Sequence, residues 1–150
     1  AGVRGFGPLR ANGYGSMDLD DYLARASNEP WIVLQIEHID AVEHLADICR
    51  VPGVGSLLVG PFDLSASMEL PGQVNHPDVQ AQLDTIATIA VEHEVTFGAF
   101  ALASDKRGIA RWVERGASWL AVDTDYGLLR RAALNAASSL RRAQNDQAST

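Results

Sequence analysis

Short apolar runs alternate with helix-like segments four times along the chain, and this alternation limits the possible folds more than any other feature. The apolar runs, which we predict to be strands, cover residues 31–37, 56–60, 95–101 and 118–122. Apolar residues at helical spacing predict helices over residues 18–27, from Asp40 to just before Pro52, from Pro77 onward, and over 105–115 and 124–142. Strands that alternate with helices are typical of a parallel sheet covered by helices, so an α/β fold is expected.

The length of the chain suggests part of a larger architecture. A complete (β/α)8 barrel takes about 250 residues. This chain has 150 residues and four clear strands, or five if residues 2–7 form another. We therefore predict the C-terminal half of a TIM barrel with a long final helix, as one domain over residues 1–143 and a polar tail over 144–150.

Composition excludes several kinds of partner. The net charge is −7 and the pI is near 4.9, which argues against nucleic acid or an anionic membrane surface. No run approaches the roughly 18 apolar residues of a membrane span. Cys49 is the single cysteine and cannot form an internal disulfide, so we expect a cytoplasmic protein.

Two carboxylates stand where predicted strands end. Glu37 ends the first strand, and Asp63 follows the second one 26 residues later, after Gly60 and Pro61. One helix and one strand separate the two acids, so a right-handed crossover would place them at the same end of nearby strands. Carboxylates with open coordination positions suit Mg²⁺ or Mn²⁺. The alternatives are a solvated strand-end Glu37 and an Asp63 that serves a turn or caps a helix.

Gln35 accompanies the first acid. Alternation along a strand puts Gln35 and Glu37 on one face, whereas Ile32, Leu34 and Ile36 share the opposite, apolar face. The polar pair would then point into the mouth of a barrel.

Other polar residues carry weaker signals. The four histidines are expected at surfaces or helix ends, at positions 38, 44, 76 and 93. Asp40 and Glu43 resemble a capping box that would begin the second helix at Asp40. Asp123 is expected to cap the last helix, with support of the acid site as the alternative. Arg4 would either bind a carboxylate or lie on the surface. The arginines of the last helix indicate a solvated or subunit-facing surface.

Several longer runs together resemble the HpcH/HpaI aldolases. These runs are GVRGFG, VLQIE, LLVGPFDLSASM, GQVNHPDVQ and ERGASWLAVDTDYGLLRRAA, and the likeness covers about residues 1–140. The family consists of metal-dependent (class II) pyruvate aldolases of aromatic or sugar-acid catabolism, including those for 4-hydroxy-2-oxoheptanedioate and 5-keto-4-deoxy-glucarate. The resemblance implies reversible cleavage of a 4-hydroxy-2-oxo acid to pyruvate and an aldehyde through a metal-stabilised pyruvate enolate.

The resemblance also implies a set of site residues. Glu37 and Asp63 would be the ligands of Mg²⁺ or Mn²⁺, with Co²⁺ as a further option, and Gln35 would hydrogen-bond the oxo acid. The pyruvate pocket would be lined by Gly60, Pro61 and Phe62. Phe62 departs from the small or polar residue usual in the family and would narrow the pocket or change which aldehyde is accepted.

The family's histidine base and its substrate-binding arginine lie in a part of the barrel that this chain does not match, so no catalytic residue is assigned. The family usually forms hexamers that exchange the last helix, which implies a homo-oligomer. Two alternatives stay open: an acyl-CoA lyase resembling the citrate lyase β subunit, and a half-barrel fragment without activity.

Overall fold

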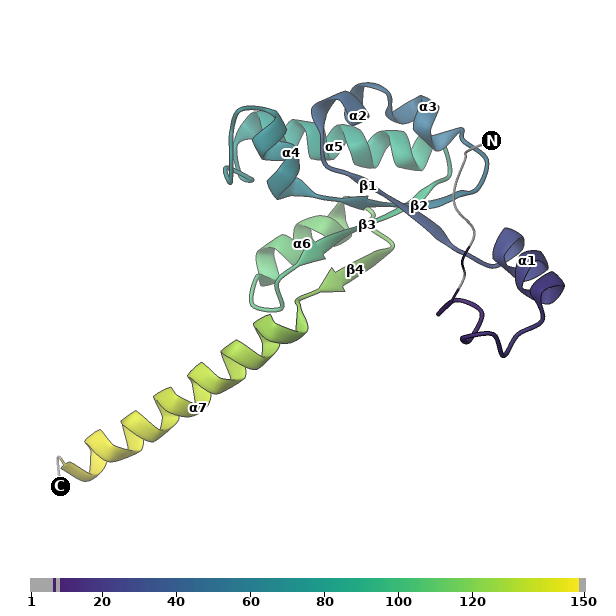
Figure 1. Cartoon of the computed structure of the whole chain (residues 1–150). Coiled ribbons are helices and arrows are strands. Elements are labelled where there is room, and N and C mark those ends of the chain that lie inside the picture. Colours follow the sequence, from purple (N-terminus) through teal and green to yellow (C-terminus); the bar gives the residue numbers. More distant parts are fainter. Residues whose placement is uncertain (1–6, 8, 149–150) are drawn as a thin grey trace. The chain divides into compact units, whose positions relative to one another are not determined.

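The computed structural model describes residue 7 and residues 9–148, and it divides into two compact units, 1–32 and 33–150 (Figure 1). Arg4 and most of the possible strand over residues 2–7 lie outside the described residues.

Among its described residues, the first unit contains one helix, α1 (Leu19–Asn28). Asp18 precedes it and accepts hydrogen bonds from the amides of Asp20 and Asp21, at 2.9 and 3.4 Å. These bonds satisfy amides that have no partner within the helix. The predicted helix over 18–27 is therefore confirmed.

The second unit is built on a four-stranded sheet in the order β1-β2-β3-β4. The strands are β1 (Ile32–Ile36), β2 (Val54–Val59), β3 (Thr96–Ala101) and β4 (Trp119–Val122). β3 runs parallel to both β2 and β4, with Leu57 opposite Phe97 and Gly98 opposite Trp119. The predicted strands and the parallel sheet are confirmed.

Helices follow the strands, and all of these helices except the last contribute buried residues to one core. They are α2 (Ile39–Glu43), α3 (Leu45–Cys49), α4 (Pro61–Ser67), α5 (Pro77–Glu92), α6 (Lys106–Glu114) and α7 (Asp125–Ala148). Figure 1 shows α2, α3 and α5 side by side over one face of the sheet. Ile36, Leu57 and Phe97 of the sheet are buried together with Leu64 of α4 and Ile86 of α5. This apolar packing fixes the strand ends that carry the acids.

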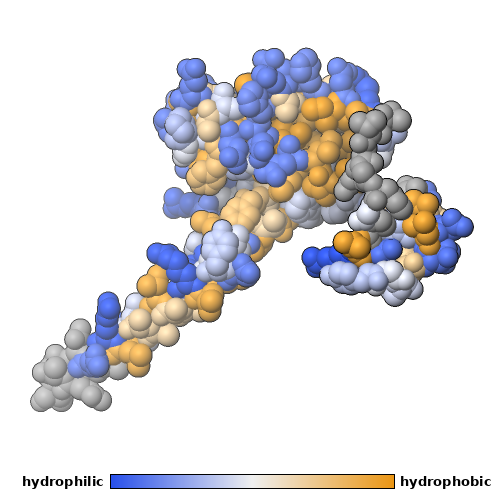
Figure 2. Space-filling model, in the orientation of Figure 1, coloured by the Kyte–Doolittle hydropathy of each residue, from blue (hydrophilic) through white to orange (hydrophobic). Residues whose placement is uncertain are grey.

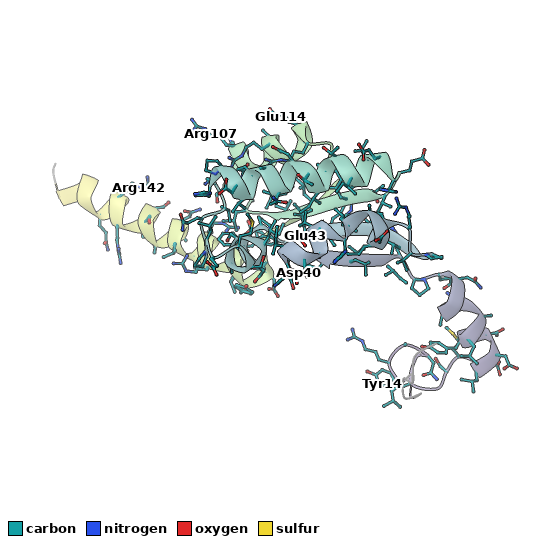
Figure 3. The ribbon with its side chains drawn as sticks, turned by 90° about the horizontal axis from the view of Figure 1, so that it is seen from above. Tyr14, Asp40, Glu43, Arg107, Glu114 and Arg142 are labelled. Atoms are coloured by element: carbon teal, nitrogen blue, oxygen red, sulfur yellow. The ribbon has the colours of Figure 1, made fainter. Side chains whose placement is uncertain are left out.

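Three sequence expectations are wrong in detail. The second helix does not begin at Asp40: the amide of Asp40 donates to His38 Nδ1 at 3.2 Å, so His38 is the cap and Asp40 and Glu43 both lie within α2 (Figure 3). The segment after β2 forms helix α4 instead of a simple turn. The last helix continues past residue 142 to Ala148, through most of the predicted tail.

A buried hydroxyl joins three strands near their beginnings. Ser56 Oγ donates to the carbonyl of Thr96 at 2.8 Å, and it accepts hydrogen bonds from Trp119 Nε1 at 2.9 Å and from Thr96 Oγ1 at 3.0 Å. Gly98 lies under the Trp119 ring, where a Cβ atom would overlap the indole. These contacts set the register of β2, β3 and β4.

Helix α7 exposes large apolar side chains. They are Tyr126, Leu128, Leu129, Leu134 and Leu140. Figure 2 shows hydrophobic surface along this helix, and Arg142 projects from it in Figure 3. Within the part of the chain that the structure describes, no helix has both the length and the apolar character needed to cross a membrane.

Candidate metal centre

The end of β1 presents two polar side chains on one face. Gln35 Nε2 donates a hydrogen bond to Glu37 Oε2 at 2.6 Å, and both side chains are exposed while Ile36 between them is buried in the core. The predicted alternation of faces is thus confirmed at the carboxyl end of β1, whereas Ile32 at its beginning is exposed instead of packed beneath helices. The hydrogen bond orients the Glu37 carboxylate and leaves its other oxygen available, because a carboxylate accepts at both oxygens.

The end of β2 lies directly against this pair. The amide of Gly60 donates to the carbonyl of Ile36 at 2.9 Å, which holds the two strand ends together. A Cβ atom on Gly60 would lie 3.1 Å from Glu37 Cβ and 3.4 Å from Gln35 Nε2. Glycine therefore permits the close approach of the β2 backbone to the Gln35–Glu37 pair.

Asp63 comes from the first turn of α4. Gly60 occupies the position before this helix and Pro61 is its first residue, where proline is well tolerated because its missing amide hydrogen would have no partner. The alternative in which Asp63 caps the helix is wrong, since Asp63 lies inside it. Asp63 is exposed.

A hollow of about 270 Å³ collects most of the predicted site residues. Its lining consists of Gln35, Leu58, Val59, Gly60, Pro61, Phe62, Asp63 and Phe100. Glu37 does not line the hollow but is hydrogen-bonded to Gln35, which does. Phe62 is 60% exposed, so its ring forms an open wall of the hollow.

Phe100 is a lining residue that sequence reasoning missed. Its neighbours Ala99 and Ala101 are buried, whereas Phe100 is partly exposed on the other face of β3. The same alternation that singled out Gln35 and Glu37 on β1 was therefore present on β3. Phe100 was not predicted to line the hollow because it is apolar, and an aromatic residue in a strand is usually assigned to the core.

The donor set fits a hard divalent cation that keeps open positions. Among the described residues, no three His, Cys, Asp or Glu side chains gather closely enough to hold a metal ion by themselves. Two carboxylates with water and an oxygen-rich ligand are the usual environment of Mg²⁺, and similar ligands suit Mn²⁺. Glu37 and Asp63 are carboxylates that follow two adjacent strands, β1 and β2.

Asp123 neither supports the acid site nor caps the last helix, the two roles predicted for it. Its side chain is only 1% exposed, accepts the amide of Ala103 at 3.0 Å and pairs with Arg131 of α7. The hydrogen bond from Ala103 lowers the pKa of Asp123, burial opposes this, and Arg131 adds to the lowering. Thr124 caps α7 instead, because its Oγ1 accepts the amide of Gly127 at 3.2 Å.

The histidines are placed as expected at helix ends. His38 and His76 accept amide hydrogen bonds at the starts of α2 and α5, and His44 and His93 stand at the ends of α2 and α5. None of these four, on the geometry of the described residues, joins the acids in a metal cluster.

A parallel sheet followed by helices, with polar residues at the carboxyl ends of adjacent strands, defines an α/β protein of the TIM-barrel type. The chain belongs to the HpcH/HpaI aldolase/citrate lyase family, whose sequence model matches residues 4–132. The family and the fold class predicted from the sequence are thereby confirmed.

Relatives in the family are named as aldolases. The chain is 35% identical over 133 residues to the 4-hydroxy-2-oxo-heptane-1,7-dioate aldolase of Escherichia coli, covering 89% of this chain and 50% of that protein. It is 34% identical over 139 residues to the hydroxypyruvate/pyruvate aldolase of Chromohalobacter salexigens, covering 91% and 53%. The chain therefore spans about half the length of the curated relatives it matches.

A solved structure supports the same assignment. The crystal structure of an HpcH/HpaI aldolase/citrate lyase family protein from Burkholderia cenocepacia matches with a TM-score of 0.80 and 31% identity. The match covers 93% of this chain and 53% of that one.

Proposed function

We propose that this chain forms the metal-binding part of a class II aldolase, which splits a 4-hydroxy-2-oxo acid reversibly into pyruvate and an aldehyde. The observation that carries the proposal is the junction of β1 and β2, where the hydrogen-bonded Gln35–Glu37 pair lies against Gly60 and Asp63 opens into the same hollow. The aldolase names of relatives at about 35% identity support it.

Each residue has a defined task in this proposal. Glu37 and Asp63 hold Mg²⁺ or Mn²⁺, or alternatively Co²⁺. When bound, the ion supplies a Lewis acid that polarises the oxo group and balances negative charge developing beside it. Gln35 orients Glu37 through the 2.6 Å hydrogen bond and presents the rest of its amide to the oxo acid. Because Gly60 has no side chain, the substrate can approach the backbone here.

Phe62 and Phe100 set the apolar side of the pocket. Both rings line the hollow that Asp63 opens into. An apolar wall excludes water from one side of the polar groups and strengthens their interactions with a bound anion. We propose that Phe62 narrows the space available to the aldehyde. No residue of the chain is assigned to proton transfer.

We further propose that the chain works as a homo-oligomer. The exposed leucines of α7 form an apolar surface on a helix of 24 residues. Covering this surface with another copy of the chain removes apolar area from water.

Metal-dependent binding of pyruvate tests the proposed function. Pyruvate is titrated into the wild-type chain by calorimetry, with and without Mn²⁺, and the same titrations are repeated with Glu37→Gln. Saturable binding that requires both Mn²⁺ and Glu37 is expected. Binding that is independent of metal would contradict the proposal.

Two further assays separate the alternatives. Saturable binding of coenzyme A at micromolar concentration would favour an acyl-CoA lyase. Pyruvate formation from oxaloacetate with Mn²⁺, above the rate with Mn²⁺ alone, would exclude a fragment without activity.

A further inference from the structure

One side-chain hydroxyl connects the two segments that carry the acids. The amide of Ile39 donates to Ser67 Oγ at 3.0 Å, and the same hydroxyl donates to the carbonyl of Leu64 at 2.8 Å. Ile39 comes two residues after Glu37, and Leu64 comes directly after Asp63. Ser67 thus links the beginning of α2 to the body of α4, across 28 residues of sequence.

The Glu37 segment is held on both sides by the segment that carries Asp63. On one side the amide of Gly60 donates to the carbonyl of Ile36, at 2.9 Å. On the other side Ser67 accepts the amide of Ile39. Only Glu37 and His38 lie between these two anchored positions, so the two hydrogen bonds limit how far the Glu37 backbone can move relative to α4.

The Ser67–Ile39 hydrogen bond uses an amide that has no partner within its own helix. The amide of Ile39 is the first of α2 and has no carbonyl to bond within that helix. A serine hydroxyl can donate once and still accept, so Ser67 satisfies Ile39 and bonds Leu64 at the same time. Leu64 is fully buried in the core, which gives the link a fixed base.

The far side of α4 is anchored separately. Buried Ser65 donates to the carbonyl of Phe62 at 2.6 Å and accepts the amide of Gly72 at 3.0 Å. Removing the Ser67 hydroxyl therefore leaves α4 in place and releases mainly the segment of Glu37. The substitution therefore affects the position of Glu37 and leaves the position of Asp63 unchanged.

We infer that Ser67 is a positioning residue for the metal site: it fixes the spacing of Glu37 and Asp63, and thereby the affinity for a divalent cation. The inference rests on the proposed function, because it assigns Ser67 a task toward the ion that those acids would hold. Ser67 itself needs no contact with the ion or the substrate.

The experiment compares Ser67→Ala with Ser67→Thr, which keeps a hydroxyl, and with Ser139→Ala as a matched control. Ser139 is exposed on α7 and also donates to a helix carbonyl, that of Asn135 at 3.0 Å, but it accepts no amide from another segment among the described residues. The affinity for Mn²⁺ is measured by electron paramagnetic resonance of the free ion, well below the unfolding temperature of every variant. Hydrogen exchange of the 36–43 segment is measured without metal.

Loss of one hydrogen bond is expected to weaken Mn²⁺ binding about three- to tenfold in Ser67→Ala. Exchange of the Ile39 amide should become faster in the same variant. Ser67→Thr should restore much of the affinity, and Ser139→Ala should bind as the wild type does.

Failure of the inference is distinguishable from failure of the proposed function. If the wild type binds Mn²⁺ and Ser67→Ala binds it equally well, Ser67 has only a structural role and the inference is overturned, even if the unfolding temperature falls. If the wild type binds no Mn²⁺, the proposed function is overturned and the inference with it.

Discussion

Replacing Ser56 with alanine tests whether one buried hydroxyl holds three strands in register. The substitution removes the acceptor 2.9 Å from Trp119 Nε1 and the donor 2.8 Å from the Thr96 carbonyl. Thr96 Oγ1 keeps a second acceptor, the carbonyl of Gly55 at 3.2 Å. Each lost hydrogen bond costs about 1 kcal/mol, so the loss of these two should lower the free energy of unfolding by about 2 kcal/mol.

The measurement is urea unfolding at constant temperature, followed by circular dichroism. The urea midpoint should fall while the slope with urea stays constant, since the surface exposed on unfolding does not change. In a Trp119→Phe background, which lacks the indole N–H, Ser56→Ala should cost about 1 kcal/mol less, because contacting residues couple by about 0.5–3 kcal/mol. Exposed Ser139→Ala should stay within about 0.5 kcal/mol of wild type. A Ser56→Ala variant as stable as the wild type, or costs that simply add, would refute this account of the register.

Three further predictions concern other parts of the chain. Gly98→Ala places a Cβ atom into the Trp119 indole and should lower the free energy of unfolding by about 1–3 kcal/mol in thermal unfolding. Gly7→Ala should have little effect, because no atom of the described residues lies within 4 Å of the Cβ position. The pKa of Asp123 is lowered in the folded state, so its stabilising contribution is complete above the unfolded value of about 3.9 and is lost as the pH falls through the folded value. Asp123→Asn should therefore lose less stability between pH 7 and pH 3 than the wild type; an equal loss would contradict the role of this carboxylate. Leu129→Glu with Leu140→Glu should reduce self-association in analytical sedimentation, since both leucines are about 70% exposed on α7, and unchanged association would place the interface elsewhere.

The strands were predictable because their signal is local. Ile36 and Leu57 belong to short apolar runs between glycines, prolines and polar residues, and such runs form buried strands. The shared face of Gln35 and Glu37 followed from the same alternation, which the 2.6 Å hydrogen bond confirms.

The sequence did not predict helix α4, because the residues at its beginning suit either a turn or the start of a helix. Gly60 and Pro61 end a strand and favour a turn, but proline is equally suited to the first turn of a helix. The helix has only seven residues, too few for a clear period of apolar positions. Its stability comes from burial of Leu64 and Ser65, which depends on the tertiary structure.

The link from Ser67 to Ile39 could not be predicted from the sequence. It joins a serine to a backbone amide, and every residue except proline offers such an amide. Only the packing of α4 against the start of α2 selects this pair. The predicted start of α2 was also wrong. Asp40 and Glu43 match the sequence pattern of a capping box, but the side chain of His38 accepts the amide of Asp40 and caps the helix.

Binding of Mn²⁺ to the wild-type chain, compared with Glu37→Gln and Asp63→Asn, tests the central claim most directly. Both variants keep the size of the side chain and remove the charge, and both positions are exposed, so folding should be preserved and can be checked by circular dichroism. The account predicts saturable binding by the wild type and a loss of more than about tenfold in affinity for each variant. Equal binding by all three proteins, or none by the wild type, would contradict it.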